Sequence, residues 1–466
     1  MSDAGAKRQH YNVTLAVLTL AGIAFALQQT MVIPALPQLQ REFDTTTGWV
    51  TWLLTGFLLS ASVATPLLSK LGDQYGKERL LLISLGIFCL GSIAAVFAPN
   101  IGVLIACRIV QGAGGAVFPL SFAIIKDEFP TEKVGSAVGV ISAVFGVGGG
   151  VGLVLAGVLL DHLSWQWIFG VGAVVMAGAI VLIYLFVPES PIKTPSRLDV
   201  GGAVLLSLGL LSLLIALTEG ESWGWTSVRT LGLLFVACLL LVSWGVYERR
   251  VPEPMVDMKM FAQRPVLFAN LTGLLAGLAL FGAFVLVPNF VQAPPSTGYG
   301  FGADATTTGL YLLPSALVGF FSGPFAGAFG KRFGPKWPLA LGMAIGGVGA
   351  AMLAALHDAP WQLVLGMTVL GAGVPMSFAA MANVIVQSVR QSETGIATGM
   401  NTVMRTVGGV IGGQVGAAIL TSNTIGSTSI PSESAFTTAF ALAAAGSLIA
   451  AAIASFTTPW RRLRQT

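Results

Sequence analysis

The sequence predicts an all-α membrane protein with two pseudo-symmetric six-helix bundles and two inserted helices, fourteen transmembrane helices in total. Three observations lead to this fold class. The chain is 9% charged and 55% hydrophobic, with a mean hydropathy of +0.82, whereas soluble domains are about 25% charged. Fourteen apolar segments are long enough to cross a bilayer. The two ends of the chain also share a pattern of glycines, prolines and charges.

Each span needs about 20 mostly apolar residues. The first apolar segment is too long for the core of a secretion signal, and no small-residue cleavage pattern follows it, so we interpret it as the first span. The predicted spans cover residues 12–36, 48–68, 80–98, 101–125, 134–160, 165–187, 199–219, 228–247, 265–291, 305–328, 336–356, 360–387, 394–422 and 434–457.

The basic residues predict the orientation, because cytoplasmic loops of membrane proteins are enriched in Lys and Arg. Of the 24 basic residues, twenty fall on the side of the termini and two, Arg41 and Arg229, fall in the opposite loops. The other two, Arg108 and Arg405, lie inside spans. We therefore expect a multi-pass protein of the plasma (inner) membrane with both termini in the cytoplasm. Basic residues at membrane edges account for the pI of about 9.0, so no nucleic-acid partner is expected.

The internal repeat has two parts. Residues 69–79 (SKLGDQYGKER) echo residues 327–336 (GAFGKRFGPK), since in both a glycine follows an ionic residue by three positions. Membrane proteins with two related halves are commonly transporters, in which one half rocks against the other around a central site. The second part of the repeat places Gly135, Gly139, Gly148 and Gly152 in register with Gly395, Gly399, Gly408 and Gly412.

The repeat also divides the chain, because spans 7 and 8 have no counterpart in it. We predict an N-terminal six-helix bundle over residues 12–187 and a C-terminal six-helix bundle over residues 265–457. Residues 188–264 form a linker with two extra transmembrane helices. Glycine runs at 146–152 and 408–413 allow close helix approach, either as static packing or as a sliding interface between the halves.

The turn between spans 2 and 3 carries a group of candidate gating residues. Asp73 can act on nearby helix N-termini, where a carboxylate is favoured, and Gly76 permits a tight turn. Lys77 and Arg79 stand where cytoplasmic cations belong. The repeat of this segment favours a conformational role for Asp73, Gly76, Lys77 and Arg79 over an ordinary charged loop.

Two arginines inside spans are candidates for coupling. An arginine in the bilayer is costly and is a functional-site hypothesis by default. Arg108 lies near the start of its span, so extension of its side chain to the interface is an alternative. Arg405 lies mid-span, and Glu219, at the outer end of span 7, is either its counter-charge or an ordinary helix end in water.

Seven neutral polar residues are candidates for the lining of a substrate cavity. Each could instead form a hydrogen bond between helices, and for a single residue the two interpretations stay open. The set is Gln28, Gln29, Thr30, Gln111, Asn289, Asn383 and Asn401.

Four motifs match a known family in order and position: SKLGDQYGKER (69–79), RIVQGAGGA (108–116), HLSWQWIF (162–169) and MNTVMRTVGGVIG (400–412). Over nearly all of its length the chain resembles the major facilitator superfamily, specifically the fourteen-helix drug:proton antiporter family. The resemblance implies the major facilitator fold and a role for Arg108 in proton transfer and conformational coupling. It implies no cofactor and no metal.

The resemblance further implies a secondary active transporter that exports amphipathic small molecules, as in multidrug efflux, in exchange for protons by alternating access. The expected partners are a small amphipathic substrate, protons and the lipid bilayer, and the expected state is a monomer. A membrane enzyme is not expected, because the sequence shows no paired intramembrane carboxylates, no metal-ligand spacing and no nucleophile–base pair.

Three departures from the family pattern leave an alternative open. Leu153 stands where the span-5 signature has a proline, and Gln28 stands where span 1 often has an acid. No carboxylate lies deep in spans 9–14. Exporters of cations often rely on such acids, so neutral or anionic amphiphiles stay open as substrates. The alternative is a lipid or metabolite exporter, or a facilitator without proton coupling.

Overall fold

The computed structural model describes residues 11–45, 47–190, 199–425 and 430–457. Every regular element in these ranges is helical, apart from an isolated β-bridge between Thr424 and Pro431. The elements are α1 (Tyr11–Glu42), α2 (Thr47–Tyr75), α3 (Lys77–Val96), α4 (Ile101–Gln111), η1 (Gly112–Ala116), α5 (Val117–Glu128), α6 (Thr131–His162), α7 (Gln166–Phe186), α8 (Val200–Trp223), α9 (Val228–Glu248), α10 (Met258–Phe261), α11 (Arg264–Gln292), η2 (Pro295–Thr297), α12 (Ala305–Phe333), α13 (Lys336–Ala355), α14 (Pro360–Ser388), η3 (Gln391–Glu393), α15 (Thr394–Ser422) and α16 (Glu433–Ser455).

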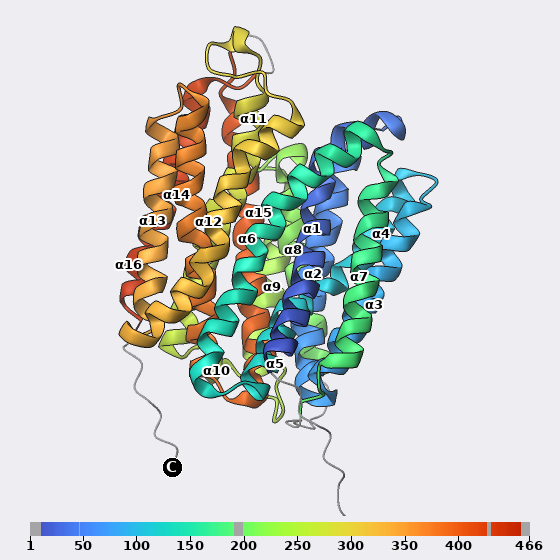
Figure 1. Ribbon diagram of the computed structural model, residues 1–466, viewed down its shortest axis with the longest axis vertical. Coiled ribbons are helices and arrows are strands. Elements are labelled where there is room, and N and C mark those ends of the chain that lie inside the picture. Colours follow the sequence, from blue (N-terminus) through green and yellow to red (C-terminus); the bar gives the residue numbers. More distant parts are fainter. Residues whose placement is uncertain (1–10, 46, 191–198, 426–429, 458–466) are drawn as a thin grey trace, which may run out of the picture.

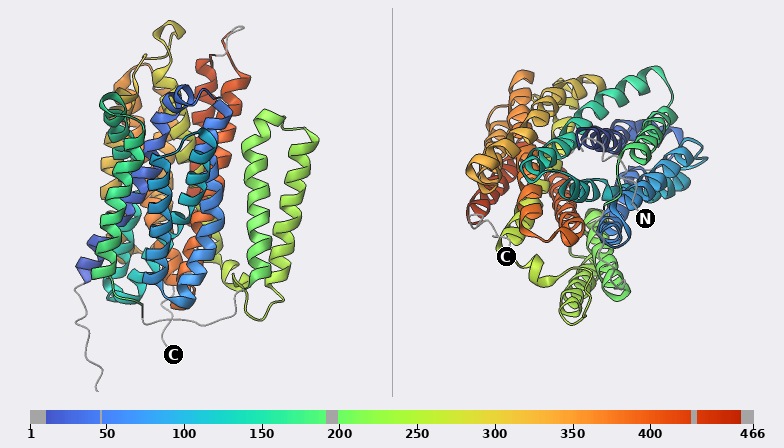
Figure 2. Two further views of the ribbon diagram at one scale, coloured as in Figure 1. Left: turned by 90° about the vertical axis from the view of Figure 1, so that its right-hand side faces the viewer. Right: turned by 60° about the horizontal axis from the view of Figure 1, so that its bottom comes forward.

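Fourteen helical stretches of the described chain are long and apolar enough to cross a membrane, with α4, η1 and α5 together forming one of them. This confirms the predicted number of spans and the all-α fold class. Helices α1–α7 form one half of the molecule and α11–α16 form the other (Figure 1). The α8–α9 hairpin stands beside these halves (Figure 2), where α8 packs on α2 and α15.

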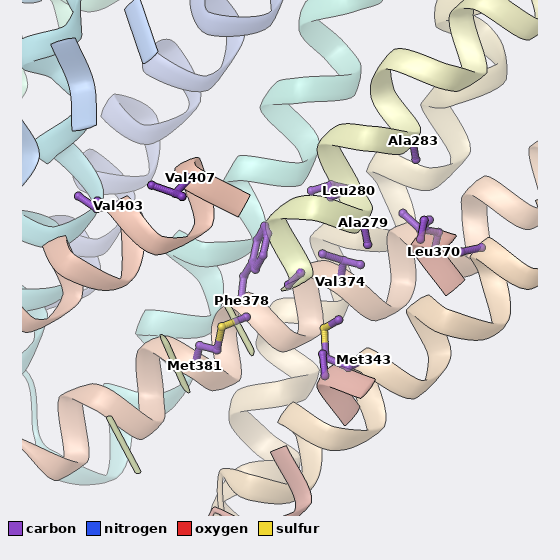
Figure 3. Packing of buried hydrophobic residues seen from close by; sticks show 14 of the residues in the cluster. Ala279, Leu280, Ala283, Met343, Leu370, Val374, Phe378, Met381, Val403 and Val407 are labelled. Atoms are coloured by element: carbon purple, nitrogen blue, oxygen red, sulfur yellow. The ribbon is translucent and has the colours of Figure 1, made fainter. Parts of the chain in front are cut away.

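Buried apolar side chains hold each half together. In the second half, side chains from α11, α13 and α14 interdigitate, among them Leu280, Met343 and Val374 (Figure 3). In the first half, phenylalanines including Phe25 and Phe88 pack with their ring centroids 5.4 Å apart. Burial of such side chains does not by itself hold helices together in lipid, so close packing of this kind is what orders each bundle.

The glycine repeat has a simple geometric meaning in the structure. The first pair in each half faces the other half: a Cβ on Gly139 of α6 would lie 2.9 Å from the carbonyl carbon of Gly323 on α12. Its counterpart Gly399 of α15 lies in the same way against Ser69 of α2, where a Cβ would be 3.0 Å from the hydroxyl oxygen. The first pair of glycines therefore permits close approach between the halves.

The second pair of glycines faces the first helix of its own half. Gly148 and Gly152 of α6 lie against Ala26, Leu27 and Thr30 of α1. The equivalent residues of α15, Gly408 and Gly412, lie against Leu274 and Leu278 of α11. In each half, the first two glycines of the pattern therefore lie at the interface with the other half, and the last two pack against the first helix of their own half.

The fourth span is not a continuous α-helix. It changes to a 3₁₀ segment at Gly112–Ala116, because the glycines there let α2 and α3 approach the backbone. A Cβ on Gly112 would lie 2.5 Å from that of Ser60, and one on Gly114 would lie 2.6 Å from the ring of Phe88. Ser60 Oγ donates to the carbonyl of Ile109 at 2.5 Å, so the break does not leave that group unsatisfied in the membrane.

Candidate functional site

The two halves are joined at the end of the molecule that holds the α2–α3 turn, the lower end in Figure 1. We call it the α2–α3 end. Asp73, near the end of α2, is 2% exposed, and its Oδ2 accepts a hydrogen bond of 3.2 Å from the backbone N–H of Ile396. Ile396 belongs to the first turn of α15. A carboxylate at a helix N-terminus is stabilised by the helix dipole and by the free N–H groups there.

Lys77 links this carboxylate to a second acid. Its ammonium lies 3.9 Å from Asp73 Oδ1 and forms a closer ion pair with Asp127 at the end of α5. Asp127 also accepts a hydrogen bond from the hydroxyl of Ser190, which follows α7. The Lys77 and Asp127 side chains are both fully buried, and their pairing offsets part of the cost of removing each charge from water. The network joins α2, α3, α5 and the segment after α7.

Gly76 makes the turn between α2 and α3 possible. Its φ is 126°, a conformation that side chains rarely adopt. The space beside it is filled by Glu189, whose carboxylate accepts the backbone N–H groups of Glu78 at 3.3 Å and of Arg79 at 3.4 Å. The Arg79 side chain is exposed, so this contact uses the backbone of Arg79 and not its charge.

Lys126 makes a second contact between the halves at this end. Its ammonium donates to the backbone carbonyl of Val389 at 2.7 Å, at the C-terminal end of α14. A cation is favoured at a helix C-terminus for the same reason that an anion is favoured at the N-terminus. Asp73 and Lys126, both from the first half, therefore bind the two ends of the α14–α15 turn with matching charges.

Asn383 contributes a neutral contact between the halves. Its Nδ2 donates to the carbonyl of Gly135 on α6 at 3.0 Å and to Ala379 of its own helix at 3.0 Å. Of the two interpretations that the sequence leaves open for Asn383, this contact corresponds to a hydrogen bond between helices, at the interface of α6 and α14.

Arg108 is fully buried inside the first half, in a chain of polar side chains. Its Nε donates to the carbonyl of Leu53 at 3.0 Å and its Nη1 donates to Gln111 Oε1 at 2.6 Å. Gln111 donates to Ser92 Oγ at 2.9 Å, and Ser92 donates to Gln28 Oε1 at 3.1 Å. Three predicted residues, Arg108 and Gln111 of α4 and Gln28 of α1, are thus joined through Ser92 of α3. The chain crosses the half from α4 to α1.

A central cavity lies between the halves, above the contacts of the α2–α3 end. Its described walls come from α1, α2, η1, α5, α11, α14 and α15. Of the predicted residues, Gln29 and Arg405 line it. The Arg405 guanidinium lies over the ring of Phe378 at 4.5 Å and donates to Thr402 Oγ1 at 3.5 Å. The described residues that line it are Phe25, Gln29, Phe57, Leu58, Ala61, Thr65, Gly115, Phe118, Phe281, Phe378, Thr402, Arg405 and Thr406.

Other predicted residues lie away from this lining. Thr30 Oγ1 donates to the Gly148 carbonyl at 3.3 Å and so packs α1 on α6. Asn401 Nδ2 donates to Asn270 Oδ1 at 3.1 Å, between α15 and α11. Asn289 is exposed and donates to its own helix, at Val285. These three side chains hold helices or cap local structure.

Glu219 is also absent from the cavity lining. Its carboxylate accepts a hydrogen bond of 2.8 Å from the hydroxyl of Ser222 near the end of α8. This arrangement agrees with a helix end in water and does not bring Glu219 to Arg405.

Lys126, Asp127 and Ser92 act in these networks although the sequence does not single them out. Lys126 and Asp127 are consecutive charges at the end of a span that also carries Arg108, and that arrangement is a usable signal. Ser92 gives no such signal, because a serine in an apolar span can always bond to its own helix, as Ser92 also does at Phe88.

Two related helix bundles that meet around a central cavity have the architecture of a secondary transporter. The chain belongs to the Major Facilitator Superfamily, whose family model matches residues 18–413 and, a second time, residues 269–464. This confirms the family resemblance found in the sequence. The family is one of transporters and not of enzymes.

Curated relatives point to the same family. The tetracenomycin C resistance and export protein of Streptomyces glaucescens is 28% identical over 332 residues, 71% of this chain and 61% of that protein. Multidrug resistance protein 3 of Bacillus subtilis (strain 168) is 29% identical over 331 residues, 71% of this chain and 63% of that protein. The multidrug resistance protein B homolog of Mycobacterium tuberculosis (strain ATCC 25618 / H37Rv) is 30% identical over 348 residues, which are 73% of this chain and 63% of that protein. The matches thus span about six-tenths of these relatives' length.

Among solved structures, the human organic anion transporter MFSD10 (TETRAN) is similar with a TM-score of 0.67, over 96% of this chain and 100% of that chain. The sequence identity is 15%. At this identity the similarity supports the fold and nothing finer.

Proposed function

We propose that the protein exports amphipathic small molecules from the cytoplasm in exchange for protons, by alternating access. The observation that carries the proposal is the pair of charged contacts that close the α2–α3 end below a central cavity. Asp73 and Lys126 bind the ends of the α14–α15 turn in the other half. Contacts of this kind can break and re-form as one half rocks against the other. The drug-resistance names of the relatives support export as the direction.

The orientation is part of the proposal. Most basic residues lie on the side of the α2–α3 turn, and the positive-inside rule places that side in the cytoplasm of the plasma (inner) membrane. The structure then represents a state in which the cytoplasmic side is closed. We further propose that the transporter acts as a monomer, with residues 12–187 and 265–457 as its two rocking units and residues 188–264 as the inserted part.

In this mechanism Asp73, Gly76 and Lys77 act in the cytoplasmic gate, and Arg108 and Arg405 act in coupling. Arginine keeps its proton in proteins, so we assign these two residues a role through their charge and hydrogen bonds and not as proton carriers. The chain from Arg108 through Gln111 and Ser92 to Gln28 offers a route by which a change at α1 reaches α4.

The second candidate is a facilitator, or an exporter of a lipid or metabolite, without proton coupling. It is favoured by the cavity lining, which contains no Asp or Glu among the described residues. A carboxylate in the cavity would be the natural site for a transported proton. In span 1, Gln28 also stands where the family often has an acid.

Transport assays in proteoliposomes that contain the purified protein can distinguish the two candidate functions. Efflux of a lipophilic dye would be measured with and without an imposed pH gradient, beside Asp73→Asn as a gate variant. We expect gradient-dependent efflux that Asp73→Asn reduces several-fold. Efflux that ignores the gradient would select the facilitator, and transport that Asp73→Asn leaves unchanged would contradict the gate assignment.

A further inference from the structure

The charges around the central cavity are positive. Among the described residues that line it, Arg405 alone carries a formal charge, and the other polar members are Gln29 and three threonines. A second guanidinium, that of Arg108, lies directly behind the wall, 4.5 Å from the ring centroid of Phe57. Phe57 itself lines the cavity. Both halves therefore place a cation at the same cavity, one at its surface and one behind its wall.

The acceptors of the Arg108 hydrogen bonds are neutral. They are the backbone carbonyl of Leu53 and the amide oxygen of Gln111, so among the described contacts no carboxylate cancels this charge. Charge interactions are strong where water is excluded. A cationic molecule in the cavity would meet positive charge from two sides and no acidic side chain of the described lining, and an anionic molecule would gain from both arginines.

The walls of the cavity suit a flat aromatic body. Phe25, Phe57 and Phe118 come from the first half, and Phe281 and Phe378 come from the second. Phenyl rings bind other aromatic rings by offset or edge-to-face contact. The arginine over Phe378 is held by stacking at 4.5 Å, and a guanidinium held in this way can direct two N–H groups to a carboxylate or sulfonate.

From these three observations we propose that the cavity binds aromatic organic monoanions. Arg405 binds the carboxylate or sulfonate of the substrate, and the ring lies among the phenylalanines of both halves. This proposal rests on the proposed transport function and narrows its substrate class from amphipathic molecules in general to aromatic anions. Cationic dyes of the same size are expected to bind poorly.

A matched set of probes tests the charge preference. The purified protein in lipid nanodiscs would bind radiolabelled 2-naphthoate in competition with unlabelled 2-naphthamide, which is neutral, and 2-naphthylmethylammonium, which is cationic. We expect 2-naphthoate to bind about 10-fold more tightly than the amide, as expected for a charge-assisted hydrogen bond, and the cation to compete least. Equal or tighter binding of the cation would overturn the proposal.

Variants assign the preference to Arg405. Arg405→Gln should reduce naphthoate binding about 10-fold and leave the amide nearly unchanged, whereas Arg405→Lys should keep part of the preference. Arg229→Gln removes an exposed arginine at the start of α9 and serves as the matched control. Identical elution profiles and melting temperatures would show that the variants are folded. If Arg405→Gln still preferred the anion as strongly as the parent protein does, the assignment of the preference to Arg405 would be wrong.

The same probes in proteoliposomes separate this inference from the transport function. Transport of the cation but not of the anion would leave the exporter standing and reject the anion class. Binding of 2-naphthoate with no movement across the membrane would support the site and reject the transport of this class.

Discussion

At the residue scale, burial decides which charged side chains do structural work in this protein. Asp73, Lys77, Arg108 and Asp127 are buried and each has a named partner, while Arg79 in the same motif as Asp73 is exposed. A buried charge must be compensated by other groups. The partners of Lys77, Arg108 and Asp127 lie within the first half, whereas Asp73 also contacts Ile396 of the second half and so constrains how the halves can move.

Gly76 gives the clearest prediction for a single residue. Gly76→Ala is expected to destabilise the protein by about 1 kcal/mol or more, because alanine is strained at positive φ. The added methyl would also lie 2.6 Å from the Cδ of Glu189. Gly86→Ala in α3 is the control, since a Cβ there meets no atom within 4 Å and alanine favours a helix. Thermal unfolding of both variants in detergent should show a lower melting temperature only for Gly76→Ala; equal temperatures would contradict the argument.

The positions of the polar residues in the spans could be predicted only in part from the sequence. In an apolar span every face is hydrophobic, so periodicity does not reveal which face meets a neighbour. Gln28 and Gln29 are adjacent and were predicted together, yet Gln28 joins the Arg108 chain and Gln29 lines the cavity. The intramembrane charges were easier to find, because their high cost marks them as special.

At the element scale, hydropathy predicted the number of membrane spans, because a span of given length is a requirement of the bilayer. It did not predict the break at Gly112–Ala116, since GAGGA contains no charged residue and no proline that would mark one. At the break, Ser60 of α2 donates to the backbone carbonyl of Ile109 in α4. Such a contact is set by tertiary packing, and it is invisible in the segment itself.

The contacts at the ends of α14 and α15 lead to a prediction for Lys126. Lys126→Met keeps most of the side-chain length and removes the charge at the C-terminus of α14. A cation in this position contributes about 0.3–1 kcal/mol, and up to about 2 kcal/mol when partly buried. The population open at the α2–α3 end should therefore rise about two- to thirtyfold.

Distances between spin labels at Arg79→Cys and Arg332→Cys, both exposed at this end and in opposite halves, would report the change. The labels require a background without Cys89, Cys107 and Cys238. The distance distribution should gain a longer component in Lys126→Met. Lys133→Met, which removes an exposed charge in the first turn of α6, should leave the distribution as in the parent; a similar shift in both variants would point to a general charge effect.

At the scale of the whole molecule, the glycines of the internal repeat occupy two kinds of interface, one between the halves and one within each half. The pair formed by Gly135 and Gly139 faces the other half at α12, and the pair formed by Gly408 and Gly412 packs within its own half on α11. The sequence predicted that these glycines allow close approach. It left open whether they serve static packing or an interface between the halves, because spacing does not identify the partner helix.

This division predicts different consequences for two chemically identical substitutions. Gly139→Ala places a methyl 2.9 Å from the carbonyl carbon of Gly323 in the other half, and Gly412→Ala places one 2.8 Å from the carbonyl carbon of Leu278 in the same half. The halves can separate to relieve the first clash, so Gly139→Ala should lengthen the distance between labels at the α2–α3 end with little change in melting temperature. The helices of one bundle cannot separate in this way, so Gly412→Ala should lower the melting temperature and leave the distance distribution unchanged. The reverse pattern would show that α6 and α12 form a fixed core and that movement occurs between α11 and α15.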